Sequence, residues 1–239
     1  MDALQVYYVP LSKKERIGTR GDGGYVIATL DDDTYDMYIG GGVNDDIEFD
    51  KALLARFPDI YGFVFDGTIA CRPVGLPSQF AYVPVNIGGL CTDISTNLVP
   101  FINKSKNVFV KMDIEGGEWG WLSLISDEDL GRIKQLVIEI HYLFDYRVAA
   151  PRVKVDVLKR LASLFYLVHV HGNNFTPNTY THEGMPYVME CTYVRKDTFA
   201  TPPRVNTDVF PTTLDFPNCP DYPDIPLTQC PFVGSLDTN

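Results

Sequence analysis

The residues best suited to chemistry lie in the segment 111–119, which has the sequence K-M-D-I-E-G-G-E-W. An apolar, β-branched run comes directly before it, which is typical of a buried strand in a parallel sheet. In open α/β sheets, ligands bind at the carboxyl edge of the strands. We therefore expect the carboxylates of Asp113, Glu115 and Glu118 to lie at an edge where chemistry takes place.

A second group of candidates follows another apolar run. Glu139 and His141 are two residues apart on this predicted strand, so both side chains point to the same face. With Asp113 from the neighbouring strand, they would suit a hard divalent cation such as Mg²⁺ or Mn²⁺. They could equally form a metal-free relay with His141 as general base, or a structural pair. His171, near the end of a later predicted strand, is a second candidate base.

Three consecutive glycines, Gly40, Gly41 and Gly42, follow the predicted strand 35–39 and precede a predicted helix. Glycine lets the backbone approach a ligand closely, although a simple tight turn gives the same pattern. Asp66 ends the next predicted strand, and an acid roughly 20 residues after such a loop typically accepts hydrogen bonds from ribose hydroxyls. Together the glycines and Asp66 predict a cofactor that contains adenosine.

The residues after the glycines distinguish between such cofactors. Asp45, Asp46 and Glu48 lie at the start of the predicted helix. Three carboxylates there would repel a pyrophosphate, but would tolerate or attract the ammonium and sulfonium groups of S-adenosylmethionine. The loop also lacks G-x-G-x-x-G, and the chain has no Tyr-x-x-x-Lys pair for hydride transfer. A methyl donor is therefore favoured over the NAD(P) of an oxidoreductase.

Composition limits the possible partners and compartment. The 239 residues are 45% hydrophobic and carry a net charge of −11. That charge argues against non-specific binding to nucleic acid or anionic membranes. No apolar run approaches the roughly 18 residues of a membrane span. Five cysteines without a C-x-x-C pair favour a reducing compartment. We expect a cytoplasmic protein, or a domain of a longer polypeptide.

Strands and helices alternate through the middle of the chain, which predicts an α/β fold with a mostly parallel sheet. We expect residues 1–34 to be a lead-in and 35–196 to form the domain. Residues 197–239 are rich in proline but contain aromatic residues, which predicts an extended strap packed on the domain. A helix is expected within 92–104. No clear helix precedes the last strand, 187–194, so one of the last two strands could run antiparallel.

Several blocks of the sequence form a recognisable set: R-x-G at 16–18 with D-G-G-Y at 22–25, G-G-G-V-N-D at 40–45, F-D-G-T at 65–68, K-M-D-I-E-G-G-E-W at 111–119 and Q-L-V-I-E-I-H at 135–141. This set resembles the FkbM-type methyltransferases, in particular the branch that includes animal methyltransferase-like proteins. The chain departs from the family pattern at Tyr38, where an acid is usual, at Asn44, where a third glycine is usual, and at Gly67, where proline is common.

The resemblance implies a class I Rossmann-like fold, with a mostly parallel seven-stranded sheet and helices on both faces. It also implies an S-adenosylmethionine-dependent O-methyltransferase, with carbohydrate hydroxyls among the acceptors. The cofactor-binding residues expected on this basis are Gly40, Gly41, Gly42, Asn44, Asp45, Asp66, Gly67 and Asp113. Two other functions compete with this hypothesis: an NAD(P)-dependent oxidoreductase, and a catalytically degenerate methyltransferase fold that serves as a binding domain.

Overall fold

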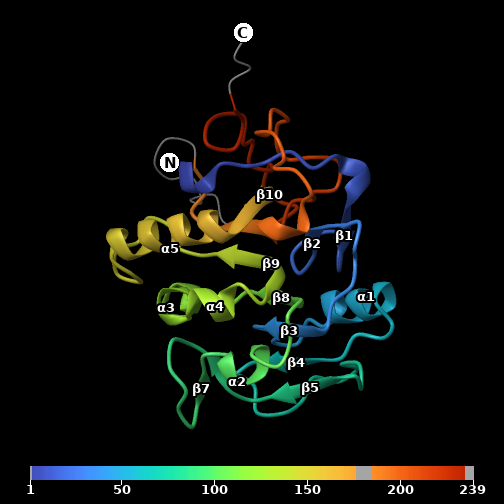
Figure 1. Ribbon diagram of the computed structural model, residues 1–239. Coiled ribbons are helices and arrows are strands. Elements are labelled where there is room, and N and C mark those ends of the chain that lie inside the picture. Colours follow the sequence, from blue (N-terminus) through green and yellow to red (C-terminus); the bar gives the residue numbers. More distant parts are fainter. Residues whose placement is uncertain (1, 176–184, 235–239) are drawn as a thin grey trace.

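The computed structural model describes residues 2–175 and 185–234 and is built around one seven-stranded sheet (Figure 1). Along the sheet the strands stand in the order β10-β11-β9-β8-β3-β4-β5. Only β11 runs antiparallel to its neighbours. Their bounds are β3 Met37–Gly41, β4 Gly62–Phe65, β5 Phe80–Val83, β8 Val108–Met112, β9 Ile133–Ile140, β10 Phe165–Gly172 and β11 Met189–Arg195.

The strand order identifies where a ligand should bind. Taken in chain order, the first five strands of the sheet are arranged 3-2-1-4-5, which is the order of doubly wound α/β folds. The chain changes direction between β3 and β8, and ligands bind outside the carboxyl ends at such a switch point. The predicted fold class, a Rossmann-like α/β fold with a mostly parallel seven-stranded sheet, is confirmed. The expectation of one antiparallel strand among the last two is met by β11.

Helices and a small hairpin cover the two faces of the sheet (Figure 1). One face packs against α1 and the hairpin β1–β2. The other face packs against α2, α3, α4 and α5. The bounds are β1 Lys14–Ile17, β2 Tyr25–Ala28, α1 Glu48–Arg56, α2 Val99–Ile102, α3 Gly117–Leu124, α4 Asp127–Leu130 and α5 Pro151–Leu164. Short elements complete the chain: η1 Asp2–Leu4, η2 Leu11–Lys13, β6 Asn86–Ile87, β7 Ser95–Thr96 and η4 Lys196–Thr198.

The N-terminal segment, expected to be a lead-in, contains the hairpin β1–β2 and is tied to the central sheet. The side chain of Gln135 on β9 exchanges two hydrogen bonds with the backbone of Ala28, at 2.7 and 3.1 Å. The hydroxyl of Thr192 on β11 donates to the carbonyl oxygen of Val26. These bonds fix β2 across β9 and β11, so that Tyr25, at the start of β2, lies over the strand ends.

The prediction of a helix over 92–104 is wrong for most of that range. The structure has β7 there and only the four-residue α2. Leu98 has a left-handed backbone with φ of 68°, and its side chain is fully buried. The hydroxyl of Thr96 accepts a hydrogen bond from the Leu98 N–H at 3.1 Å. The Leu98 N–H thus bonds to a side-chain oxygen, whereas in a helix it would bond to a backbone carbonyl oxygen.

The proline-rich C-terminal segment packs on the domain and lies above β10 in Figure 1. Phe210, Ile225, Leu227 and Phe232 belong to the same buried cluster as residues of β9 and β10. Phe210 and Leu227 also exchange two backbone hydrogen bonds, at 3.2 and 2.9 Å. Apolar anchors of this kind hold a segment that has little regular structure of its own.

Gly42, directly after β3, lies tightly against Asp113, directly after β8. Its φ of 72° is left-handed, and a Cβ atom built on it would lie 1.6 Å from the carbonyl oxygen of Asp113. The N–H of Asp113 donates to the carbonyl oxygen of Gly41 at 3.0 Å. Only glycine fits this position, both for its backbone angle and for its contact.

Replacing Gly42 by alanine is therefore expected to lower the free energy of unfolding by at least about 2 kcal/mol, through backbone strain and the clash with Asp113. Gly120→Ala on α3 is the matched control, since a Cβ there meets nothing within 4 Å. It should raise stability by about 0.5–1 kcal/mol, because alanine favours helix. Urea denaturation measures both, and equal effects would contradict the close approach.

Candidate active site

A cavity of about 710 Å³ opens at the carboxyl ends of β3, β4 and β8, the switch point of the sheet. Its volume is in the range of small-molecule sites. Seven of the eight residues predicted to bind the cofactor line it: Gly40, Gly41, Gly42, Asn44, Asp45, Asp66 and Asp113. A second cavity of about 650 Å³ lies along α5, is mostly apolar, and has none of the predicted site residues in its lining.

Gly67, expected to bind the cofactor, is not among the residues that line the cavity. A Cβ atom on Gly67 would lie about 2.5 Å from the side-chain amide of Asn86. Asn86 lines the cavity, as does Thr68. Gly67 thus leaves room for Asn86 to approach, and its predicted contact with the cofactor stays a prediction.

Asp66 lines the cavity and also holds two neighbouring lining residues, Asn44 and Thr68, by hydrogen bonds. One carboxylate oxygen accepts the N–H of Asn44 at 2.8 Å. The other accepts the N–H and the hydroxyl of Thr68, at 2.7 and 2.5 Å. The first bond holds Asn44 in its left-handed conformation, with φ of 43°. A carboxylate has about four acceptor sites, so Asp66 retains the capacity to bind hydroxyl groups of a ligand.

The cavity is strongly acidic. Among the described residues that line it, Lys111 is the only basic one, and seven are acidic: Asp22, Asp45, Asp46, Asp50, Asp66, Asp113 and Glu115. The buried Tyr38 hydroxyl interacts with the buried carboxylate of Asp50, and both residues line the cavity. Burial raises the pKa of Asp50 to about 6. Such a lining is unfavourable for a pyrophosphate and favourable for a cationic ligand.

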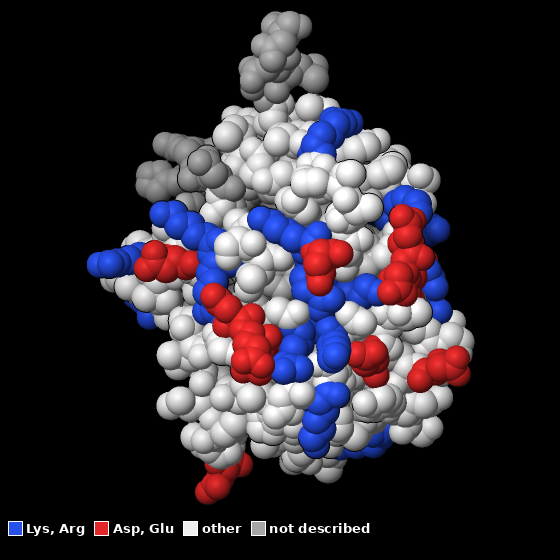
Figure 2. All heavy atoms as spheres, in the orientation of Figure 1, with Lys and Arg blue, Asp and Glu red and all other residues white. Residues whose placement is uncertain are grey.

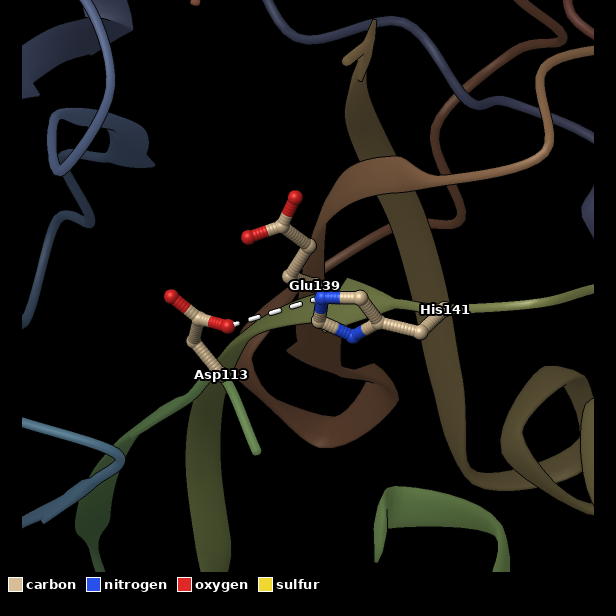
Figure 3. Close-up of side chains that lie close together, drawn as sticks. All are labelled: Asp113, Glu139 and His141. Carbon is tan, nitrogen blue, oxygen red and sulfur yellow. Dashed lines mark ion pairs between the residues drawn. The ribbon is translucent and has the colours of Figure 1, made fainter. Parts of the chain in front are cut away.

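Asp113, which lines the cavity, lies close to Glu139 and His141, and its carboxylate and the His141 ring are directed toward each other (Figure 3). One potential ligand atom from each lies within 4.8 Å of the others. The Nε2 atom of His141 is 3.7 Å from Asp113 Oδ1. Glu139 and His141 are almost fully buried, whereas 25% of the Asp113 side chain is exposed. The three residues predicted to act together are thus neighbours in space.

Tyr25 joins the two carboxylates of this cluster, and it was not foreseen as a site residue. Its hydroxyl lies 3.0 Å from Asp113 Oδ2 and 3.2 Å from Glu139 Oε2. The ring is buried, and Lys111 lies over it at 5.1 Å. The block D-G-G-Y in the sequence marks this tyrosine, but sequence spacing gives no sign that the hairpin folds back over β8 and β9.

His141 is surrounded by carboxylates. Its backbone N–H donates to Glu118 Oε1 at 2.7 Å, and its Nδ1 lies 3.5 Å from the same oxygen. Its Nε2 is also 3.5 Å from Glu115. Burial alone would lower the pKa of His141, but Glu118 and the carboxylates of the cluster raise it to about 9. Glu118 therefore orients the His141 imidazole and favours its protonated form. It also supports the start of α3.

The pKa values of the two carboxylates in the cluster shift in opposite directions. Burial raises the pKa of Glu139 to about 8, and Asp113 adds to the rise. Burial would also raise the pKa of Asp113, but Lys111 and His141 hold it below its ordinary value. In this arrangement His141 keeps its proton at neutral pH, which argues against the predicted role of His141 as general base. The ionised, partly exposed Asp113 faces the cavity instead.

His171 does not reach the cavity, so its predicted role as a second base is corrected. Its Nδ1 pairs with Glu190 at 3.1 Å and its Nε2 with Asp224 at 2.9 Å. The imidazole is buried, and both nitrogens are occupied. The sequence pattern of alternating histidines predicted a strand end correctly, but could not reveal that the C-terminal segment covers it.

The backbone is strained at three positions around the site. Asn44, Glu115 and Tyr142 have positive φ values of 43°, 55° and 54°. Non-glycine residues in this region cluster at functional sites. Trp119 and Trp121, by contrast, are fully buried and pack in the core of the domain, so neither is available to stack on a ligand.

Comparisons with known proteins give only a distant structural similarity. No model of a known protein family matches the chain, and no curated protein matches it. Among solved structures, the chain is similar to one described as "Crystal structure of methyltransferase CalO6", at 15% sequence identity and a TM-score of 0.36. The match covers 68% of this chain and 58% of that chain. The fold class rests on the strand order of this chain and not on that similarity.

Acidic and basic side chains are interspersed on the face of the molecule shown in Figure 2, with neither sign forming a continuous patch there. None of the helices in the described part of the chain has the length and apolar character needed to cross a membrane. The five cysteines are free thiols.

The buried His171 should make stability depend on pH. Burial alone would lower its pKa, but Asp224 and Glu190 raise it to about 10, above its ordinary value of 6.5. The stabilisation is complete below pH 6.5 and is lost as the pH rises through about 10, at no more than about 1.4 kcal/mol per pH unit. Urea denaturation from pH 6.5 to 10 should show a steeper loss for the wild type than for His171→Gln. Parallel profiles would contradict this pairing.

Proposed function

We propose that this chain is an S-adenosylmethionine-dependent O-methyltransferase that methylates a hydroxyl group of a carbohydrate. One observation carries the proposal: Asp113 both lines the acidic cavity and belongs to the cluster with Glu139 and His141. A donor in the cavity and an acceptor at the cluster would therefore meet at one carboxylate. Methyl transfer needs this adjacency, because the acceptor oxygen must lie in line with the methyl carbon.

The cavity supports the choice of donor. S-adenosylmethionine carries a sulfonium and an ammonium group, and the lining offers seven carboxylates against one lysine. Asp66 lies where an acid typically binds ribose hydroxyls. Asp50 adds a buried carboxylate to this lining, and a carboxylate can accept hydrogen bonds from an ammonium group. A dinucleotide would have to place its pyrophosphate beside Asp45 and Asp46, which argues against the oxidoreductase alternative.

The cluster supports the choice of chemistry. A sugar hydroxyl has a high pKa, so the site must remove its proton or lower that pKa. Asp113 is ionised and faces the cavity, while Tyr25 and Lys111 hold its Oδ2 atom in place. Two carboxylates and one imidazole at this spacing are also a suitable donor set for Mg²⁺ or Mn²⁺. Such an ion would make the acceptor hydroxyl more acidic.

The carbohydrate acceptor follows from the resemblance to the FkbM-type methyltransferases, and the chemistry of the cluster is compatible with it. Carboxylates accept hydrogen bonds from neighbouring hydroxyl groups. Tyr142, which is half-buried and follows His141 directly, lies 5.7 Å from the imidazole between ring centres. The Tyr142 ring is the aromatic surface on which an acceptor could stack, since the two tryptophans are buried.

The donor assignment is tested by calorimetry with two ligands. S-adenosylmethionine and S-adenosylhomocysteine should both bind, because they share the adenosine and amino-acid groups. Asp45→Asn should weaken the sulfonium-bearing donor several-fold more than the neutral thioether, because one exposed carboxylate of the lining is lost. Asp221→Asn, an exposed site on the C-terminal segment, is the matched control. Failure of both ligands to bind at high micromolar concentration would overturn the proposal.

The reaction centre is tested by a mass-shift screen of small glycans with the methyl donor, with and without EDTA. A product heavier by one methylene unit is expected from the wild type. Glu139→Gln should reduce the yield by about 100-fold or more while the affinity for S-adenosylhomocysteine stays within about twofold, because Glu139 does not line the cavity. Full activity in that variant or in Asp113→Ala would remove the cluster from the reaction. Donor binding without methylation of any acceptor would favour a binding domain.

A further inference from the structure

The carboxylate of Glu139 is held by a residue of the loop after β10. Asn173 donates through its Nδ2 atom to Glu139 Oε1 at 2.6 Å, a shorter contact than the one from Tyr25. The Oδ1 atom of Asn173 accepts the N–H of Phe175 at 2.8 Å. That bond fixes which end of the amide faces Glu139, because a carbonyl oxygen can accept a hydrogen bond but cannot donate one.

The next residue, Asn174, is held by the C-terminal segment. Its side chain is 2% exposed. Its Oδ1 atom accepts the N–H of Cys219 at 2.9 Å. Its Nδ2 atom lies within hydrogen-bond distance of three carbonyl oxygens, those of Cys219, Tyr222 and Pro223, at 3.1, 2.9 and 3.2 Å. The loop that carries Asn173 is thus fixed from outside the Rossmann-like sheet.

The same segment also contacts Glu190, the carboxylate next to Glu139. Glu190 on β11 lies directly opposite Glu139 on β9, and two carboxylates in such positions are unfavourable. Asn218 donates to Glu190 Oε1 at 2.7 Å and to Asp22 Oδ1 at 3.2 Å. His171 pairs with the other oxygen of Glu190, and Asp224 holds His171 in turn. The segment therefore supplies both Asn218 and Asp224 to this network.

From these contacts we infer that Asn218, Asp224 and the backbone of Cys219, Tyr222 and Pro223 position the Glu139 carboxylate, with Asn174 as the residue that couples the C-terminal segment to Asn173 and so to the reaction centre. The inference rests on the proposed function in one respect, that Glu139 belongs to that centre. Asn173 and Asn174 are positioning residues, since Asn173 acts through Glu139 and Asn174 acts through Asn173.

The test uses the full chain labelled with ¹⁵N and follows the side-chain amide of Asn173, assigned with Asn173→Asp. In the wild type the short hydrogen bond to Glu139 should shift this resonance downfield. Asn174→Ala should return it toward the position of a free amide. Asn174→Ser, a smaller perturbation, serves if the alanine variant does not fold. Asp221→Asn is the control within the segment and should leave the resonance unchanged.

Two binding measurements accompany the spectrum. Mn²⁺ affinity should fall about 10-fold in Asn174→Ala, which is typical for loss of a group that supports a metal-binding carboxylate. Affinity for S-adenosylhomocysteine should change less than twofold. An unchanged Asn173 resonance, or equal losses for both ligands, would overturn the inference. If the wild type binds neither ligand, the proposed function fails, and the resonance alone still decides whether the segment positions Glu139.

Discussion

The close approach of the ends of β3 and β8 is the constraint on which the candidate site depends. The backbone of Gly42 lies against the carbonyl group of Asp113, leaving no room for a side chain. This contact brings the glycine loop of one strand and the acidic end of the other into a single cavity. The acids that follow Gly42 and the carboxylate of Asp113 are thereby held side by side. A larger residue at Gly42 would separate two halves of the site that the proposed reaction needs side by side.

Burial determines how the charged groups of the cluster can behave. Asp113 and Glu139 share the hydroxyl of Tyr25, but their environments differ. Lysine and histidine neighbours keep the pKa of Asp113 low, whereas burial raises that of Glu139. One carboxylate is therefore available as a charge in the cavity, and the other depends on its hydrogen-bond partners. Such divergence between neighbouring titratable groups is typical of active sites.

Much of the fold could be predicted from local patterns. The buried strands β8 and β9 appear as apolar runs that end in acids, and α5 begins near Pro151, as expected for proline in a first turn. The helix expected within 92–104 failed because Thr96 and Asn97 bond to the backbone locally and the left-handed Leu98 interrupts the helical path. Periodicity alone carries no information about such competing bonds.

The candidate site was predictable where strand ends supply it, because the carboxyl ends of parallel strands converge at one edge. Asp113, Glu139 and His141 were found in this way. Tyr25 and Asn173 were not, because they reach Glu139 from the N-terminal hairpin and from a loop held by the C-terminal segment. Their positions depend on long-range packing, as does the covering of His171 by Asp224. The regions outside the central α/β unit thus contribute to the site in ways that residue spacing does not reveal.

The most direct test of the central claim, that the cavity between β3, β4 and β8 binds the methyl donor, is amide hydrogen exchange measured with and without S-adenosylhomocysteine. The account predicts that the ligand slows exchange in residues 40–46 and 66–68, with no comparable change along α5. Unchanged exchange in both loops at a saturating concentration of the ligand would contradict it.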